Sequence, residues 1–155
     1  VTVNSGGTVS VSGAVSLSGS LTVNGVIKLT GSGDITRNNG TVSIGGSGTI
    51  DITGAAAEKT TLCGNPIDTM DTALSGLTVA PGAKIKLTYS QFTYNSTSLW
   101  SAFSSEGGDV TITIIDKQGT GETWRFKVEQ GSGESAITKY WNGTAVVDND
   151  PSSGS

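Results

Sequence analysis

Residues 8–31 consist of four consecutive six-residue blocks, TVSVSG (8–13), AVSLSG (14–19), SLTVNG (20–25) and VIKLTG (26–31). Each block ends in glycine and carries two aliphatic residues separated by one polar residue. Alternation with a period of two places aliphatic side chains on one face of a strand and polar ones on the other. A repeat of one strand and one corner is typical of a solenoid, whose coils stack about 4.8 Å apart. We therefore predict an all-β fold with a parallel β-solenoid (β-helix) in the N-terminal part.

The six-residue step also predicts which side chains form the core. We expect inward-facing side chains at Val9 and Val11, and a continuous buried column of Val15, Leu17, Leu21, Val23, Ile27 and Leu29. The step then lengthens, because Arg37 falls where an aliphatic residue is expected. Asn38-Asn39 indicates a bulged corner at this point.

The composition divides the chain into two parts, since all nine Phe, Trp and Tyr residues lie from Tyr89 onward. We predict β-solenoid coils over residues 1–88, with a loop excursion at 55–75 that leaves the coils and rejoins them. An aromatic-rich β region over 89–148 is expected to act as a cap or as a small β domain. Residues 149–155, rich in Ser, Asp and Gly, are expected to form a tail.

The aromatic-rich region contains one helix signal and several strand signals. STSLWSAFSS (96–105) predicts a short helix, because Leu99, Trp100 and Phe103 share a helical face. Alternating or β-branched segments predict strands at 109–116, 121–130 and 136–148. Within the last segment, Asn142-Gly143 predicts a two-residue hairpin turn.

Charge and residue content argue against several classes of function. The formal net charge is -4, from 9 basic and 13 acidic residues without a Lys/Arg cluster, so nucleic-acid binding is not expected. No apolar run approaches the roughly 18 residues of a spanning helix, so no membrane insertion is expected. Histidine is absent and Cys63 is the single cysteine, which removes the commonest general base and zinc ligand. We therefore expect no enzyme activity, no cofactor and no metal site.

Four aromatic residues are candidate glycan or subunit contacts, since amphipathic rings stack on sugars and line interfaces. They are Trp100, Trp124, Tyr140 and Trp141. The alternative interpretation, which we favour, is that the aromatic residues form a cap over the open end of the solenoid. Apolar core and unpaired backbone groups would otherwise be exposed there.

Three segments carry a resemblance to a known group of proteins: VSVSGAVSLSGSLTVNGVIKLTGSGDI, NNGTVSIGGSGTIDITG and LTVAPGAKIKL. They resemble the β-strand repeats of bacterial autotransporter-type passenger and surface proteins. The resemblance covers roughly residues 1–88. It implies a parallel β-helix in an extracellular or cell-surface protein.

From these observations we expect a non-enzymatic structural or adhesive β-solenoid, with copies of itself or neighbouring segments of a longer surface protein as partners. The pattern of VTVNSGGTVSVSG (1–13) predicts that these residues already belong to a coil, with no cap before them. The unpaired backbone groups of such an end can pair with a further layer of strands. The chain is therefore either a fragment of a longer surface protein or the subunit of a head-to-tail filament. Two alternatives remain, a carbohydrate-binding or carbohydrate-cleaving β-helix module and a trimeric tail-fibre-like protein whose chains share the aliphatic core.

Overall fold

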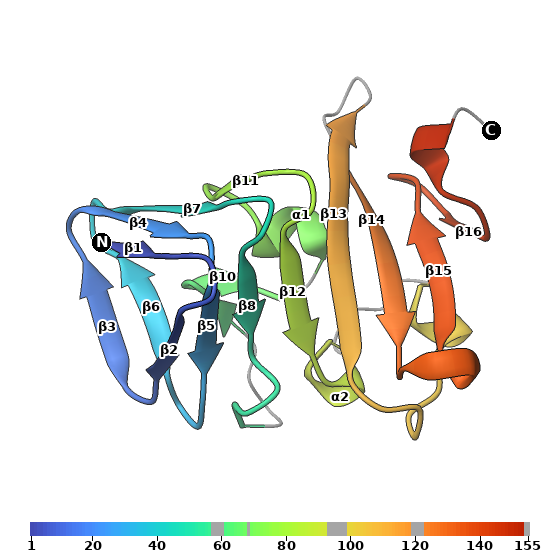
Figure 1. Cartoon of the computed structure of the whole chain (residues 1–155), viewed down its shortest axis with the longest axis horizontal. Coiled ribbons are helices and arrows are strands. Elements are labelled where there is room, and N and C mark those ends of the chain that lie inside the picture. Colours follow the sequence, from blue (N-terminus) through green and yellow to red (C-terminus); the bar gives the residue numbers. More distant parts are fainter. Residues whose placement is uncertain (57–60, 68, 93–98, 119–122, 154–155) are drawn as a thin grey trace.

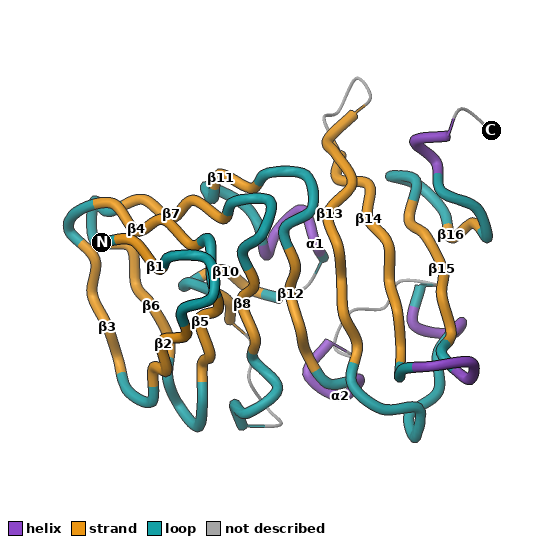
Figure 2. The backbone as a smooth tube through the Cα atoms, in the orientation of Figure 1, coloured by secondary structure: helices purple, strands orange, loops and turns teal. Residues whose placement is uncertain are grey.

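The structure, a computed structural model, describes residues 1–56, 61–67, 69–92, 99–118 and 123–153. Strands dominate and the helical elements are short (Figures 1 and 2). The strands up to residue 56 are β1 (Thr2–Val3), β2 (Thr8–Val11), β3 (Ala14–Leu17), β4 (Ser20–Val23), β5 (Val26–Leu29), β6 (Asp34–Arg37), β7 (Thr41–Ile44) and β8 (Thr49–Asp51). The later strands are β9 (Thr61–Leu62), β10 (Asn65–Pro66), β11 (Thr78–Val79), β12 (Lys84–Leu87), β13 (Val110–Gln118), β14 (Thr123–Gln130), β15 (Ile137–Trp141) and β16 (Val146–Val147). The helical elements are α1 (Met70–Ala73), α2 (Tyr89–Phe92) and the 3-10 turns η1 (Trp100–Ala102), η2 (Gly133–Ser135) and η3 (Pro151–Ser153).

In the N-terminal part, each of the strands β1 to β5 pairs in parallel with the strand three places further along the chain, whereas β7 and β8 pair in parallel with β11 and β12, four places further. One sheet has the order β1-β4-β7-β11, a second begins β2-β5-β8-β12, and a third contains β3 and β6. Thr2 lies beside Thr22 and Thr8 beside Val26, so the chain returns to the same sheet after 20 and 18 residues, respectively. We call β1–β3 the first layer and β4–β6 the second layer. The predicted β class and the parallel pairing are confirmed, and each six-residue block of 8–31 contains one strand.

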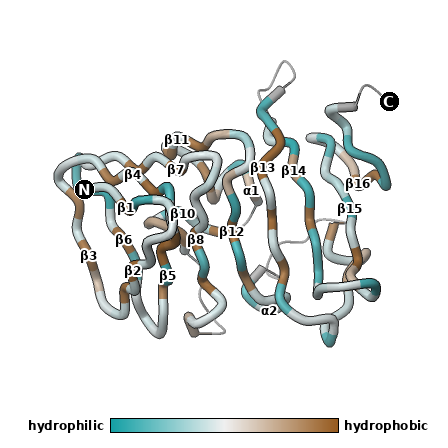
Figure 3. The backbone as a smooth tube through the Cα atoms, viewed as in Figure 1, coloured by the Kyte–Doolittle hydropathy of each residue, from teal (hydrophilic) through white to brown (hydrophobic). Residues whose placement is uncertain are grey.

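The core follows the inward-facing positions of these strands, and apolar and polar residues alternate along them in Figure 3. Neighbouring strands of the second sheet place Ile27, Ile50, Ile85, Ile112 and Val128 side by side. Each of these side chains is at most 2% exposed. The isoleucine column therefore runs from the parallel strands into the antiparallel ones without interruption.

The predicted burial is correct for the second layer and partly wrong for the first. Leu21, Val23, Ile27 and Leu29 are buried. Leu17 and Val11 are only partly buried. Val9 and Val15, by contrast, are 45% and 38% exposed. The reason is positional, because among the described residues nothing stacks on the outer side of the first layer.

The second sheet changes from parallel to antiparallel pairing at β12. This strand pairs in parallel with β8 and antiparallel with β13, and β14, β15 and β16 then extend the same sheet. In Figure 1 the N-terminal strands lie at one end of the long axis and β15 and β16 at the other. The predicted hairpin of β15 and β16 is present, but its loop spans residues 142–145. The Asn142 side chain accepts the amide hydrogens of Thr144 and Ala145, which favours this longer loop.

The predicted loop excursion at 55–75 contains secondary structure. β9 and β10 form an antiparallel pair, and α1 follows with Thr69 as its N-cap. The described part of the helix expected at 96–105 contains only the turn η1, whereas residues 93–98 lie outside the described region. The described part of the expected tail is bound to the sheet, because Arg125 donates to the carbonyl of Pro151 at 3.1 Å.

Candidate interaction surfaces

The outer side of the first layer, which we call the first-layer edge, is formed by β1, β2 and β3. Each of these strands has a parallel partner on one side, and the described part of the chain places no strand on the other. Among the described residues, the large exposed hydrophobic side chains are Val1, Val9 and Val15, all in or beside this layer. An apolar patch next to unpaired strand edges is typical of an interaction surface.

The hydrogen bonds of β2 determine which of its backbone groups point outward. The carbonyls of Gly7 and Val11 accept amide hydrogens from the β5 side, both at 2.9 Å. Backbone groups of alternate residues in a strand point in opposite directions within the sheet. The backbone N–H and C=O groups of Thr8 and Ser10 therefore point away from β5, on either side of Val9.

The same geometry holds for β3. The carbonyls of Gly13 and Leu17 accept amide hydrogens from Asp34 and Asn38, at 3.2 and 2.8 Å. The backbone groups of Ala14 and Ser16 consequently point outward. Within the part of the chain that the structure describes, no strand pairs with these outward donors and acceptors, which lie beside the exposed side chains of Val9 and Val15.

Arg37 fastens the 61–77 segment to β6. Its Nη2 donates to Asn65 Oδ1 at 2.7 Å, and its Nε donates to the carbonyl of Cys63 at 3.3 Å. Asn65 in turn donates to the carbonyls of Ala73 and Ser75, at the end of α1. A charged residue thus occupies the predicted aliphatic position because its guanidinium group holds the hairpin of β9 and β10.

Asp34, at the other end of β6, makes a second attachment. Its Oδ1 accepts the amide hydrogen of Cys63 at 3.0 Å, and its Oδ2 accepts the hydroxyl hydrogen of Thr61 at 2.5 Å. The third sheet ends at β6, and the hairpin of β9 and β10 follows it through these side-chain bonds instead of a backbone ladder.

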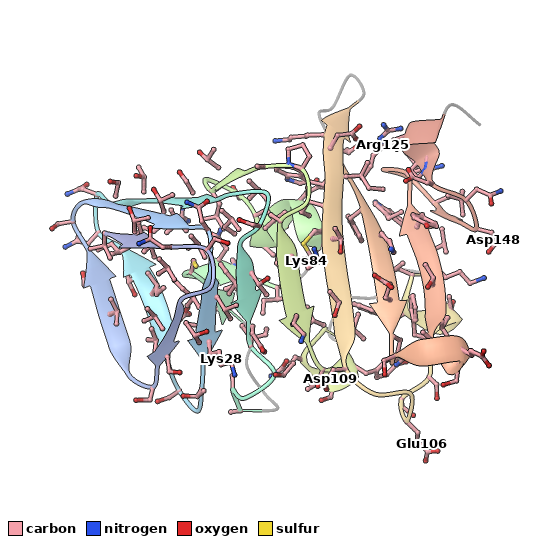
Figure 4. All side chains as sticks on the ribbon, viewed as in Figure 1. Lys28, Lys84, Glu106, Asp109, Arg125 and Asp148 are labelled. Atoms are coloured by element: carbon pink, nitrogen blue, oxygen red, sulfur yellow. The ribbon has the colours of Figure 1, made fainter. Side chains whose placement is uncertain are left out.

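Other carboxylates also bind groups of their own chain. Asp116 forms a bidentate pair with Arg125, with both distances 2.6 Å. This hydrogen-bonded pairing raises the pKa of Arg125. Lys139 and Asp148 form a pair at 2.7 Å, and Figure 4 shows Asp148 and Arg125 at the C-terminal end of the protein. In the described ranges, no cluster of three His, Cys, Asp or Glu residues is arranged to hold a metal ion.

Two of the four aromatic candidates are buried. Trp100 is 4% exposed and packs edge to face against Tyr89 and Phe103, with ring centres 6.2 and 5.8 Å apart. Trp124 is 8% exposed, and its ring lies 5.2 Å from the ammonium group of Lys117. Rings buried to this extent do not offer a face for stacking on a sugar.

The other two candidates, Tyr140 and Trp141, are half-buried neighbours in β15. Successive side chains of a strand point to opposite faces, so the two rings do not form one platform. The ring of Trp141 stacks on Phe126 at 6.4 Å and 23°, which directs it toward the core side of the sheet. Tyr140 lies on the opposite face, beside Lys127 of β14.

One hollow of about 360 Å³ lies between the end of α1 and the strands β13 and β14. Its lining includes Asp71, Gly76, Lys117 and Trp124. The Asp71 carboxylate accepts the amide hydrogen of Trp124 at 3.0 Å. Sequence reasoning missed this site because Asp71 and Lys117 lie far apart in the chain and belong to no recognisable motif.

Comparison with models of protein families, with curated proteins and with solved structures found no match for this chain. In the ranges that the structure describes, no helix has both the length and the apolar character needed to cross a membrane. The fold is that of a mostly β protein with parallel sheets in its N-terminal part.

Proposed function

We propose that this chain is a non-enzymatic structural module, built as a parallel β-solenoid, of an extracellular or cell-surface assembly. The support is the pairing of each of the strands β1 to β5 with the strand three places on, in three parallel ladders. In this interpretation the ladders are the sides of a coil, and each layer adds inward-facing aliphatic residues to the same column. The resemblance of residues 1–88 to surface-protein repeats agrees with this role.

The observation that carries the structural role is how the chain uses its charged side chains. Asp34 and Arg37 hold the hairpin of β9 and β10, Asp71 holds the start of β14, and Asp116 pairs with Arg125. Groups that serve in catalysis converge on a substrate-sized space. These groups instead join separate segments of the fold, which is the requirement of a scaffold.

The aromatic region serves in this proposal as the cap of the solenoid. Trp100, Phe103 and Phe126 belong to the same apolar cluster as Leu87 of the last parallel strand. Burial of such rings contributes substantially to stability where a column of aliphatic residues ends. From β4 onward, the inward-facing aliphatic side chains of the described strands are buried by the same chain, which argues against the trimeric alternative, where three chains would share the core.

A second candidate function is weak glycan binding at the hollow beside Trp124. The observation that favours it is the presence of Asp71 and Lys117, two hydrogen-bonding side chains, in the lining of one hollow. Lys117→Ala is the suitable test, because the Lys117 side chain is exposed and its loss leaves the core intact. A glycan array signal that this variant loses would support the candidate.

The layered architecture can be tested by removing one layer. Deletion of residues 8–25 joins Gly7 to Val26 and removes 18 residues, the spacing of the β2 and β5 register. Since stability in a solenoid is a sum over layers, the shortened protein should still unfold in one cooperative transition, and its far-UV circular dichroism spectrum should keep the shape typical of β-sheet. The matched control is deletion of residues 8–13. It removes β2 alone and moves β3 and β4 out of the sheets in which they pair, so this variant should be much less stable. Equal stability of the two deletions would contradict the proposal.

The surface location needs a separate measurement. An antibody raised against the purified chain should label intact source cells before permeabilisation. Labelling that appears only after permeabilisation would contradict an extracellular or cell-surface role.

A further inference from the structure

We infer that the outward face of the second sheet binds an acidic polysaccharide, with lysine side chains of β12 and β14 contacting its anionic groups. The inference goes beyond the proposed structural role, because it rests only on the side chains of this sheet. Neither the first-layer edge nor the hollow beside Trp124 takes part in it.

The alternation along the strands determines which side chains of the sheet point outward. Ile50, Ile85 and Ile112 are at most 2% exposed, and they point into the core. Successive side chains of a strand point to opposite faces, so the neighbours of these isoleucines point outward. The strand register aligns one set of outward side chains across the sheet from β8 to β15, and we call this set the lysine row. It consists of Thr49, Lys84, Thr113, Lys127 and Tyr140.

The lysine row has the dimensions of a site for an extended chain. Neighbouring strands lie about 4.8 Å apart, so the five positions span about 19 Å, and Lys84 and Lys127 are separated by about 9.6 Å. Lys84 is exposed, and the side chain of Lys127 is 36% exposed. Figure 4 labels Lys84 on β12 and Lys28 on β5 of the same sheet. A linear polymer that lies across the strands can therefore contact both ammonium groups of the row.

Three lysines of this face lack a carboxylate partner in the part of the chain that the structure describes. Lys84 donates to the carbonyl of Gly82 at 3.4 Å, and no described carboxylate forms a salt bridge with it. Lys28 and Lys86 lie in the adjacent outward row, two strands apart, and they also form no salt bridge with a described residue. Their ammonium groups are available to an anionic ligand.

The two carboxylates of the same face are bound by their own chain. Asp51 Oδ1 accepts the amide and hydroxyl hydrogens of Thr53, at 2.9 and 2.6 Å. Glu129 pairs with Lys127 at 3.2 Å. The two rows thus carry four lysines and two carboxylates, on a chain whose net charge is -4. This local excess of positive charge is complementary to an anionic partner.

The other side chains of the lysine row favour a glycan among the possible polyanions. Thr49 and Thr113 place hydroxyl groups on either side of Lys84, and these can bond sugar hydroxyls. The half-buried ring of Tyr140 ends the row beside Lys127, where it can stack on the apolar face of a sugar. Single-stranded nucleic acids instead need several rings on which successive bases stack, and membrane surfaces need large apolar side chains that insert. The lysine row contains a single ring and no large aliphatic side chain.

Binding of the purified chain to polymers of defined charge tests the inference. Polygalacturonate and dextran sulfate carry carboxylate and sulfate groups, respectively, and neutral dextran is the uncharged control. We expect binding to an acidic polymer and not to dextran, and the comparison of the two acidic polymers identifies the preferred anion. Binding should weaken with added NaCl, because salt screens exposed charges.

Variants of the lysine row locate the binding site. Replacing both Lys84 and Lys127 by Gln should lower the affinity at least about fivefold, whereas Lys84→Arg keeps the charge and should retain binding. Tyr140→Leu should lower the affinity about threefold through loss of the ring. The matched control is Lys117→Gln, which removes the same charge beside Trp124 and should leave binding unchanged. Circular dichroism should stay unchanged in each variant, because these side chains lie outside the aliphatic core.

Four outcomes would overturn the inference. They are the absence of binding to both acidic polymers, full affinity of the double Gln variant, a loss of affinity caused by Lys117→Gln instead, and tighter binding to an oligothymidylate or to phosphatidylserine vesicles than to either polymer. None of these outcomes bears on the layer-deletion test, so the inference and the proposed scaffold can fail independently.

Discussion

Replacing Ile50 by alanine is the sharpest test of the buried column formed by Ile27, Ile50, Ile85, Ile112 and Val128. Ile50 lies in β8 and is fully buried, and its register partners on the two sides are Ile27 and Ile85. Truncation of a buried isoleucine to alanine costs about 2–5 kcal/mol, depending on how far the surroundings collapse into the cavity. Because both neighbouring strands are fixed in register, little collapse is available, and we expect a loss of about 3–5 kcal/mol in the free energy of unfolding.

The assay is urea unfolding followed by circular dichroism, with a thermal melt as the second measurement. For a chain of this size, a loss of this magnitude corresponds to a decrease in Tm of about 6–20 °C. The matched control is Thr49→Ala in the same strand, where the side chain is half-buried and lies on the other face. Its expected cost is about 1 kcal/mol or less. A loss below about 1 kcal/mol for Ile50→Ala, or equal losses for the two variants, would refute the assignment of the inner face.

The remaining predictions concern the attachments and the chemistry. Asp34→Ala removes the acceptor of the Cys63 amide hydrogen, so amide exchange at Cys63 should accelerate at least about tenfold, since such bonds are worth about 1.5–3 kcal/mol. Asp34→Asn keeps an acceptor and should change the exchange rate less. Hydrogen bonds from Ser152 lower the pKa of Asp150. The ionised Asp150 carboxylate therefore stabilises the fold above the ordinary carboxyl pKa, and this stabilisation is lost as the pH falls through the lowered pKa. A titration of the Ser152 amide resonance between about pH 5 and 2 should show this loss, and Asp150→Asn should abolish the response. Finally, a panel of polysaccharides should show no turnover by the purified chain, and turnover abolished by a single Asp or Glu substitution would contradict the non-enzymatic role.

The sequence predicted the parallel strands of the N-terminal part well, because the local pattern of glycine and aliphatic residues agrees with the tertiary structure. Glycine corners and alternating aliphatic residues at 8–31 place β2, β3, β4 and β5 correctly. Asn39 adopts a φ of +68° at the predicted bulged corner, a conformation that asparagine tolerates better than most residues. The turn at 80–82 between β11 and β12 was also predictable, and Gly82 has a φ of +94°.

The attachments were not predictable, because they depend on partners that are distant in sequence. Arg37 appeared only as an exception to the aliphatic pattern, and its partners Cys63 and Asn65 carry no local signal. The aromatic candidates were chosen by residue type, which does not reveal burial, and Trp100 belongs to the core. The exposure of Val9 and Val15 depends on the position of their layer in the stack, which alternation alone does not show.

The pairing of strands three places apart is the central claim, and cross-strand nuclear Overhauser contacts measure it directly. The account predicts backbone contacts between Ser16 and Thr36, between Thr22 and Ser43, and between Lys28 and Asp51, all in parallel register. Contacts instead between neighbouring strands of the sequence, in the antiparallel pattern of hairpins such as β2 with β3, would contradict it.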